Sequence, residues 1–238
     1  ELVQKFEDLP KDIEWHMIGH LQSNKVKHIA PFVSLIHGID SEKLLKEITE
    51  IVIEHQSESL RILALKFYKK NPAELRKITS DSPEVTVNWL FTSQHDWKFK
   101  EINDAQGIQA LDQVFDENFK GDRVLSLITG LYTMLITAHD NQKEFDMFDS
   151  LDPQLIYNAA RNVEVIVWRL SSKRKKNGEL FLVTNEINDD SQNLSFEREF
   201  GKIIGRTDYF AYVLSEKKER YITRVVQGTT LNILLPFL

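Results

Sequence analysis

Cysteine is absent from the 238 residues of this chain. Disulfides, thiolate metal ligands, cysteine nucleophiles and lipid attachment through cysteine are therefore excluded within it. The chain also lacks an excess of basic charge, with 30 Lys and Arg against 36 Asp and Glu and a net charge of -6. Because nucleic-acid-binding surfaces are usually basic, we expect no nucleic-acid partner.

Long apolar runs are missing as well. The longest stretch, 124–138, is interrupted by Ser126, Thr129, Gly130 and Thr133. It falls short of the about 20 residues that cross a bilayer, so we expect a buried core helix and no transmembrane segment. The chain also contains no Walker loop, nucleophile elbow or dinucleotide fingerprint.

The first 50 residues alternate between strand and helix patterns. Residues 13–19 and 33–39 read as short strands, and residues 23–32 carry apolar side chains at helical spacing. Asp40 and Ser41 are suitable caps for a helix that follows. This order is typical of parallel α/β folds, and it predicts a βαβα segment over residues 1–50.

The remainder, residues 51–238, reads almost entirely as helix. Asn71-Pro72, Ser82-Pro83 and Asp152-Pro153 are helix starts, with the polar residue as cap and proline at the first position. Expected helices cover 60–70, 85–91, 106–119, 123–139, 153–176, 195–214 and 217–234. Residues 180–184 fit either an isolated strand or a packed loop. The predicted fold class is mainly α, a helical domain preceded by the incomplete βαβα segment.

One motif in the first segment is specific: Trp15-His16-Met17-Ile18-Gly19, then Leu21-Gln22 and Asn24-Lys25. It resembles the signature of the pyridoxal-phosphate (PLP) homeostasis proteins, which look like the N-terminal barrel domain of bacterial alanine racemases. Residues 36–41 are similar to the strand and helix cap that follow in that family. The resemblance covers residues 1–48.

This resemblance implies the third and fourth strands of a (β/α)₈ barrel. The family's Schiff-base lysine lies on an earlier strand that this sequence does not include, so Lys25 is not assigned that role. Gly19, Asn24 and Lys25 are the candidate cofactor-binding residues if PLP binds. Because two of eight strands cannot close a barrel, we expect no cofactor, with PLP as the alternative.

The rest of the chain, about 58–238, resembles an uncharacterised proteobacterial helical family whose members often look like envelope lipoproteins. Its matching blocks are Asn71-Pro72, 121–124, 151–154, 157–162 and 194–198. The family implies no known activity. The sequence departs from it by having no leader-like start and no lipid-bearing cysteine, so bacterial cytoplasm and periplasm or envelope both stay open.

Other polar residues have structural interpretations. His16, His20, His28 and His37 lack metal-ligand spacing, so no metal is expected. The pairs His95-Asp96 and His139-Asp140 fit capping or solvation. Asp146, Asp149 and Asp152 lack the glycine and distal Glu of a calcium loop.

On the helix predicted over 153–176, Asn158, Arg161 and Asn162 are expected to be buried hydrogen-bonding residues that fix helix packing, in preference to a binding site. No catalytic constellation emerges. The sequence therefore predicts a non-catalytic helical protein, binding or structural, that acts through an unknown protein partner. A PLP-binding homeostasis protein is the alternative, and envelope association is a third option. Whether the composite chain is natural, designed or misjoined stays open.

Overall fold

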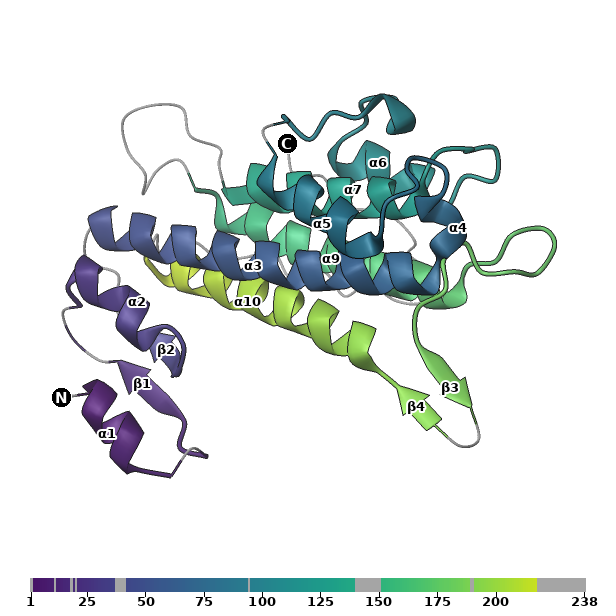
Figure 1. Cartoon of the computed structure of the whole chain (residues 1–238). Helices are drawn as coiled ribbons and strands as arrows, with labels where there is room; N and C mark the ends of the chain where they lie inside the picture. The colour runs from purple at the N-terminus through teal and green to yellow at the C-terminus, as the bar shows by residue number, and fades with distance from the viewer. Residues whose placement is uncertain are drawn as a thin grey trace.

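The computed structural model describes residues 2–10, 12–17, 19, 21–36, 42–93, 95–139, 151–188 and 191–217. The chain is mainly α-helical, as the sequence predicts (Figure 1). Four long helices, α3, α7, α9 and α10, form its body, and a small mixed segment lies at one end of α3. Among the helices described, none is both long and apolar enough to cross a membrane.

The N-terminal segment contains α1 (Leu2–Asp8), β1 (Trp15–Met17), the 3-10 turn η1 (Ser23–Lys25), α2 (Val26–Ile29) and β2 (Val33–Ile36). The two strands pair in parallel, with Trp15 opposite Val33 and Met17 opposite Ile36. A parallel pair needs a crossover, and η1 with α2 supplies it. The expected strand–helix–strand order is therefore present, and its assignment to a barrel stays a prediction.

The helical part begins with α3 (Glu42–Lys70), which passes through residue 50 without a break. Next come α4 (Pro72–Leu75), α5 (Pro83–Thr92), η2 (Lys100–Ile102), α6 (Gly107–Gln113) and α7 (Arg123–His139). The chain then forms α9 (Pro153–Ser172) and α10 (Ser195–Lys217). Helix α10 packs on α9 and α3, while α7 packs on α3, α6 and α9.

Several element boundaries differ from those expected. The helix predicted over 106–119 ends at Gln113 and continues as turns. Residues 180–184, by contrast, take one of the two predicted forms, a packed loop, with one isolated bridge between Arg174 and Leu180. The antiparallel strands β3 (Glu186–Asn188) and β4 (Ser191–Asn193) were not predicted, because these mostly polar residues give no alternating apolar signal. Most of the helix expected over 217–234 lies outside the described residues.

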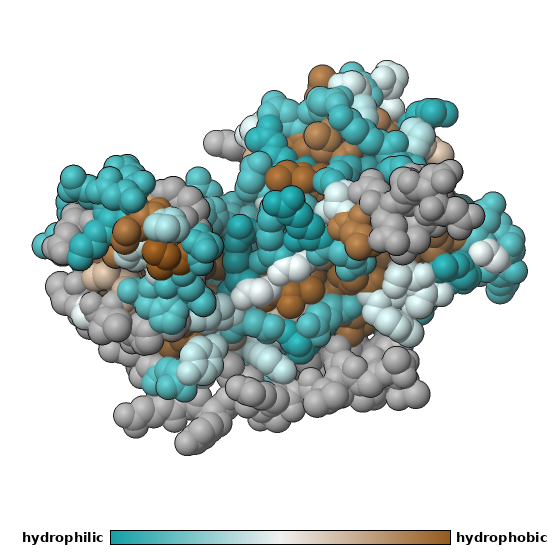
Figure 2. Space-filling view, turned by 90° about the horizontal axis from the view of Figure 1, so that it is seen from below, coloured by the Kyte–Doolittle hydropathy of each residue, from teal (hydrophilic) through white to brown (hydrophobic). Residues whose placement is uncertain are grey.

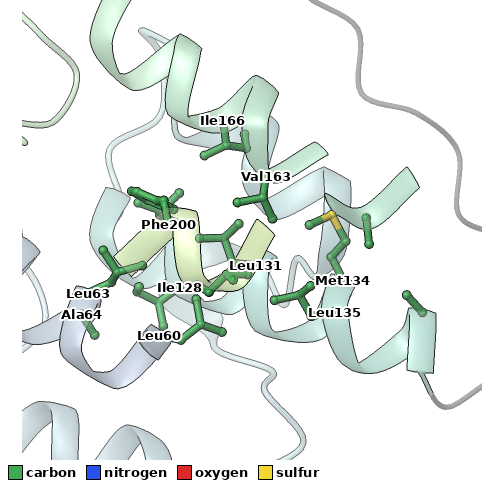
Figure 3. Packing of buried hydrophobic residues seen from close by; sticks show 14 of the residues in the cluster. Leu60, Leu63, Ala64, Ile128, Leu131, Met134, Leu135, Val163, Ile166 and Phe200 are labelled. Atoms are coloured by element: carbon green, nitrogen blue, oxygen red, sulfur yellow. The ribbon is translucent and has the colours of Figure 1, made fainter. Parts of the chain in front are cut away.

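The hydrophobic core lies where the four long helices meet (Figure 3). Leu63 of α3, Leu131 of α7 and Val163 of α9 are fully buried there. From α10, Phe200 joins them, with its ring centroid 6.3 Å from that of Phe67. Helix α7 packs on α3, α4, α6 and α9 and buries most of its side chains, as expected for a strongly apolar helix.

Candidate functional site

The three candidate cofactor residues of the signature lie on the surface. Gly19 has a φ of +95°, a left-handed conformation that favours glycine, and nothing within 4 Å would contact an added Cβ. Asn24 and Lys25 sit in η1, and both are exposed. Asn24 and Lys25 thus share one short turn, Gly19 precedes that turn in the sequence, and all three residues are exposed to solvent.

A groove of about 260 Å³ runs between this segment and the helical body. Apolar side chains from four elements form most of its wall: Val26, Ala30, Val33, Ile48, Ile51, Val52, Phe210 and Val213. Three polar side chains also line it, namely His55 of α3 and Arg206 and Tyr209 of α10. The groove therefore combines an apolar wall with one permanent cation.

Arg206 is held in place from α3. Its Nη1 donates to the carbonyl oxygen of His55 and to the hydroxyl of Ser59, both at 3.1 Å. Desolvation lowers the pKa of this half-buried guanidinium, and Glu199 opposes that effect from a distance. No carboxylate pairs with Arg206 among the residues that the structure describes. A cation that loses hydration without an ion-pair partner is suited to receive an anion.

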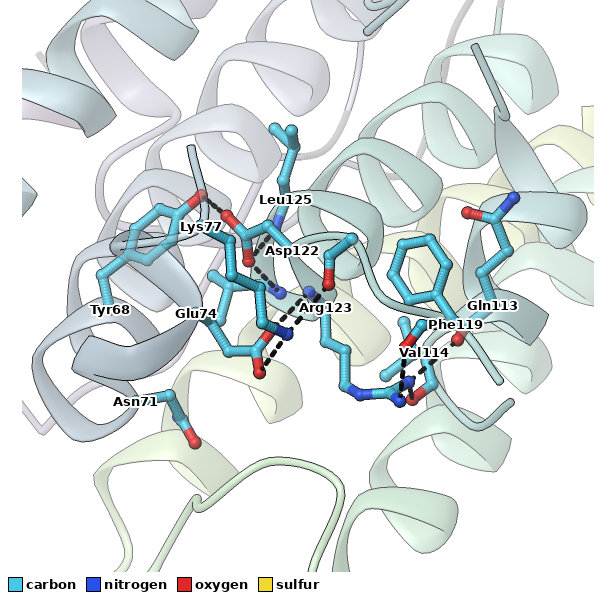
Figure 4. A network of polar contacts seen from close by, with 12 residues as sticks. Tyr68, Asn71, Glu74, Lys77, Gln113, Val114, Phe119, Asp122, Arg123 and Leu125 are labelled. Carbon is cyan, nitrogen blue, oxygen red and sulfur yellow. Dashed lines mark hydrogen bonds and ion pairs between the residues drawn. The ribbon is translucent and has the colours of Figure 1, made fainter. Parts of the chain in front are cut away.

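A second polar centre holds the start of α7 (Figure 4). Asp122 accepts hydrogen bonds from the backbone N–H groups of Val124 at 2.8 Å and Leu125 at 3.1 Å, as a helix cap does. Tyr68 of α3 donates its hydroxyl to the other carboxylate oxygen at 2.7 Å. Glu74 accepts the backbone N–H of Arg123 at 2.7 Å. These contacts fix α7 against α3 and α4.

Burial dominates the electrostatics of this centre. Desolvation raises the pKa of Asp122 to about 6, against the opposing bonds from Tyr68 and the backbone, and it raises the pKa of Tyr68 well above its ordinary value. Perturbed carboxyl groups often mark active sites. Asp122 is fully buried and each of its oxygens accepts a bond, so we interpret this centre as structural.

The polar residues predicted on α9 occupy different environments. Asn158 and Asn162 are buried, and Asn158 accepts a hydrogen bond from Gln154 at 2.8 Å. Arg161 reaches Glu164 on its own helix at 2.8 Å and pairs with Asp208 of α10. Its guanidinium also lies over the ring of Tyr157. These contacts link α9 to α10, and the packing role of the three residues stays a prediction.

The remaining histidines and acidic residues do not converge. His16 lies 3.8 Å from Glu14 and is exposed, and His28 is exposed too. His95 contacts the carbonyl of Leu90 at 2.9 Å, and Asp152 caps α9. No group of three metal-ligating side chains occurs within the described ranges. His20, His37, Asp140, Asp146 and Asp149 fall outside them.

Comparison with known proteins finds a short similarity. No family model and no solved structure matches the chain. A stretch of 49 residues, 20% of this chain, is 49% identical to the pyridoxal phosphate homeostasis protein of Aquifex aeolicus. A stretch of 45 residues is 49% identical to the pyridoxal phosphate homeostasis protein of Schizosaccharomyces pombe.

These matches cover 22% and 19% of the two curated proteins, so the chain spans about a fifth of the length of the relatives that it matches. They support the resemblance to the PLP homeostasis proteins over that short region. The resemblance of residues 58–238 to an envelope family stays a prediction.

Sequence reasoning missed Arg206 and the groove around it. No local signal could have found the groove, because its wall joins α2, β2, α3 and α10, and Arg206 bonds to a residue 147 positions away. The sequence pattern of an amphipathic helix predicts that an arginine such as Arg206 is exposed to solvent. Only the packing of α10 on α3 makes it part of a concave surface.

Proposed function

We propose that this protein is a non-catalytic helical protein that binds a small amphipathic anion in the groove between α2, α3 and α10. The observation that carries the proposal is Arg206, a half-buried guanidinium on an apolar wall with no carboxylate partner in the described part of the chain. Ligand sites commonly combine an apolar lining with a few oriented polar groups. In this reading Arg206 binds the anionic group and the valines beside it contact the apolar body.

Octanoate is a suitable probe, and calorimetric titration measures its binding. We expect octanoate to bind more tightly than 1-octanol, its uncharged counterpart, and Arg206→Gln to weaken octanoate binding by about tenfold, as loss of one charged hydrogen bond implies. Val52→Phe, which narrows the groove and leaves Arg206 intact, should also weaken binding.

Arg198→Gln is the matched control, since Arg198 is an exposed arginine on the same helix and does not line the groove. It should bind octanoate as the natural chain does. Equal affinity for octanoate and 1-octanol, or unchanged binding by Arg206→Gln, would contradict the proposal.

A PLP-binding homeostasis protein is the second candidate, favoured by the 49% identity to two such proteins over 45 to 49 residues. The two cavities described in this structure offer no support for a Schiff-base site, because neither is lined by a lysine, and Lys25 of the signature is exposed. Incubation with excess PLP tests this candidate. A visible absorbance that borohydride removes, with one modified lysine in the mass spectrum, would support it, and a colourless protein would exclude it.

The compartment is a further proposal. Envelope association through a protein partner rests on the resemblance of residues 58–238 alone. Fractionation of cells that express the full-length gene tests it, and recovery of the protein only in the soluble cytoplasmic fraction would contradict it.

A further inference from the structure

A second cavity, with a volume of about 310 Å³, is lined by residues of α5, of the segment that precedes α5, of the turn at η2 and by Leu125 of α7. Its floor is apolar, formed by Ile78, Phe99 and Leu125. Val85 and Trp89 of α5 also line it and stay 55% and 47% exposed. Large apolar side chains at this exposure, beside a cavity, are typical of binding surfaces.

The charged residues that line the cavity are all acidic. Asp81 and Glu101 both line it and both are exposed, while none of its lining residues is a lysine, arginine or histidine. The two acids come from different elements, one before α5 and one in η2. Two exposed carboxylates and an exposed indole that line the same cavity form an environment that attracts a cation.

The turn that precedes Phe99, on the aromatic side of the cavity, is anchored by contacts with α7 and with Gln106. Trp97 has a φ of +51°, an unusual conformation for a bulky residue, and its ring stacks on Tyr132 of α7 at 3.9 Å. Gln106 donates to the carbonyl oxygens of Asp96 and Trp97, at 2.7 and 3.2 Å. This strained turn leads directly to Phe99, whose ring lies 5.8 Å from that of Trp89. These contacts fix the position of the backbone that leads to Phe99 on the aromatic side of the cavity.

We propose that this cavity binds a small organic cation with an apolar body, such as an arylalkyl amine. The ammonium group lies between Asp81, Glu101 and the indole of Trp89, and the apolar body contacts Phe99 and Leu125. The site is separate from the anion groove, because the two cavities share no lining residue.

Calorimetric titration with 2-phenylethylammonium tests the proposal, with 2-phenylethanol as the uncharged counterpart. We expect the cation to bind more tightly than the alcohol, and this preference to fall with added salt. Trp89→Leu should weaken binding of the cation by about fivefold. The double variant Asp81→Asn with Glu101→Gln should remove the preference for the cation.

Two control substitutions match these variants. Trp168→Leu changes another exposed tryptophan, and Glu54→Gln another exposed carboxylate, and neither residue lines the cavity. Both should bind the cation as the natural chain does. Failure of the natural chain to bind the cation, equal affinity for 2-phenylethanol, or an equal loss in Trp168→Leu would each overturn the proposal.

Discussion

His139, at the end of α7, is a buried titratable side chain, and no charged partner for it occurs among the residues that the structure describes. Neither ring nitrogen has a hydrogen-bond partner among the described residues, and the ring lies 5.2 Å from that of Phe210. Desolvation lowers the pKa of His139 to about 4. The folded chain therefore keeps this imidazole neutral at pH values where the unfolded chain protonates it.

Acid should consequently destabilise the protein through His139. Between pH 6.5 and 4 the unfolded state binds the extra proton, so the free energy of unfolding falls as pH falls, by about 3 kcal/mol. Asp122 acts in the opposite sense, because its raised pKa makes the folded state hold the proton between pH 3.8 and about 6. Urea titrations of the natural chain and of His139→Phe at several pH values separate the contributions of His139 and Asp122 to the free energy of unfolding. The variant should lack the His139 contribution, and identical pH profiles would contradict this assignment.

Arg161 gives a second test at the scale of the residue. Its ion pair with Asp208 joins α9 to α10, and its side chain is only 15% exposed. A double-mutant cycle with Arg161→Met and Asp208→Asn should yield a coupling of about 1 to 3 kcal/mol in the free energy of unfolding. The pair Arg161 and Glu164, within one helix, should couple by less than 1 kcal/mol. A coupling near zero for Arg161 and Asp208 would contradict the packing role predicted from the sequence.

At the scale of elements, α6 and α7 pack closely because of one glycine. A Cβ added at Gly130 would lie 2.7 Å from Leu111 and 2.9 Å from the carbonyl oxygen of Gly107. Gly201, in α10, has nothing within 4 Å of the same position. The two glycines therefore form a matched pair, one required by packing and one exposed.

Gly130→Ala should lower the free energy of unfolding by about 1 to 3 kcal/mol through overpacking. Gly201→Ala should raise it by about 0.5 to 1 kcal/mol, because alanine loses less backbone entropy in a helix. Thermal unfolding followed by circular dichroism measures both. Destabilisation by Gly201→Ala equal to that by Gly130→Ala would show that the close contact is not the cause.

Helix starts were the most predictable elements, because their signals are local. Ser82 and Asp152 cap α5 and α9 at the predicted positions. Asn71 also precedes Pro72 as expected, but its side chain does not cap α4. It exchanges two hydrogen bonds with the backbone of Val183 instead, at 2.8 and 3.0 Å. That partner is 112 residues away, so the sequence around Asn71 could not reveal it.

At the scale of the whole molecule, α3 connects the two parts that the sequence separates at residue 50. Leu44 and Leu45 before that residue, and Leu60 and Leu63 after it, all belong to one buried cluster. The boundary at residue 50 stays a prediction, and a shared helix favours opening of both parts together.

Native-state hydrogen exchange can decide whether the parts before and after residue 50 unfold together. We expect amides of residues 45–49 and 60–66 to open with the same free energy, within about 1 kcal/mol. Leu45→Ala should then reduce protection on both sides of residue 50. Early exchange of residues 45–49 alone, with the rest unchanged, would instead support two separate units.

The sequence by itself determined the mainly helical class, most helix starts and the likeness of a short region to PLP homeostasis proteins. These follow from apolar spacing, capping residues and a contiguous motif, all of which operate over a few neighbouring residues. Only the tertiary structure decided that Arg206 lines an apolar groove and that Trp89, Asp81 and Glu101 share a cavity. Such sites depend on which faces of distant helices meet, and that is fixed by packing of the whole core.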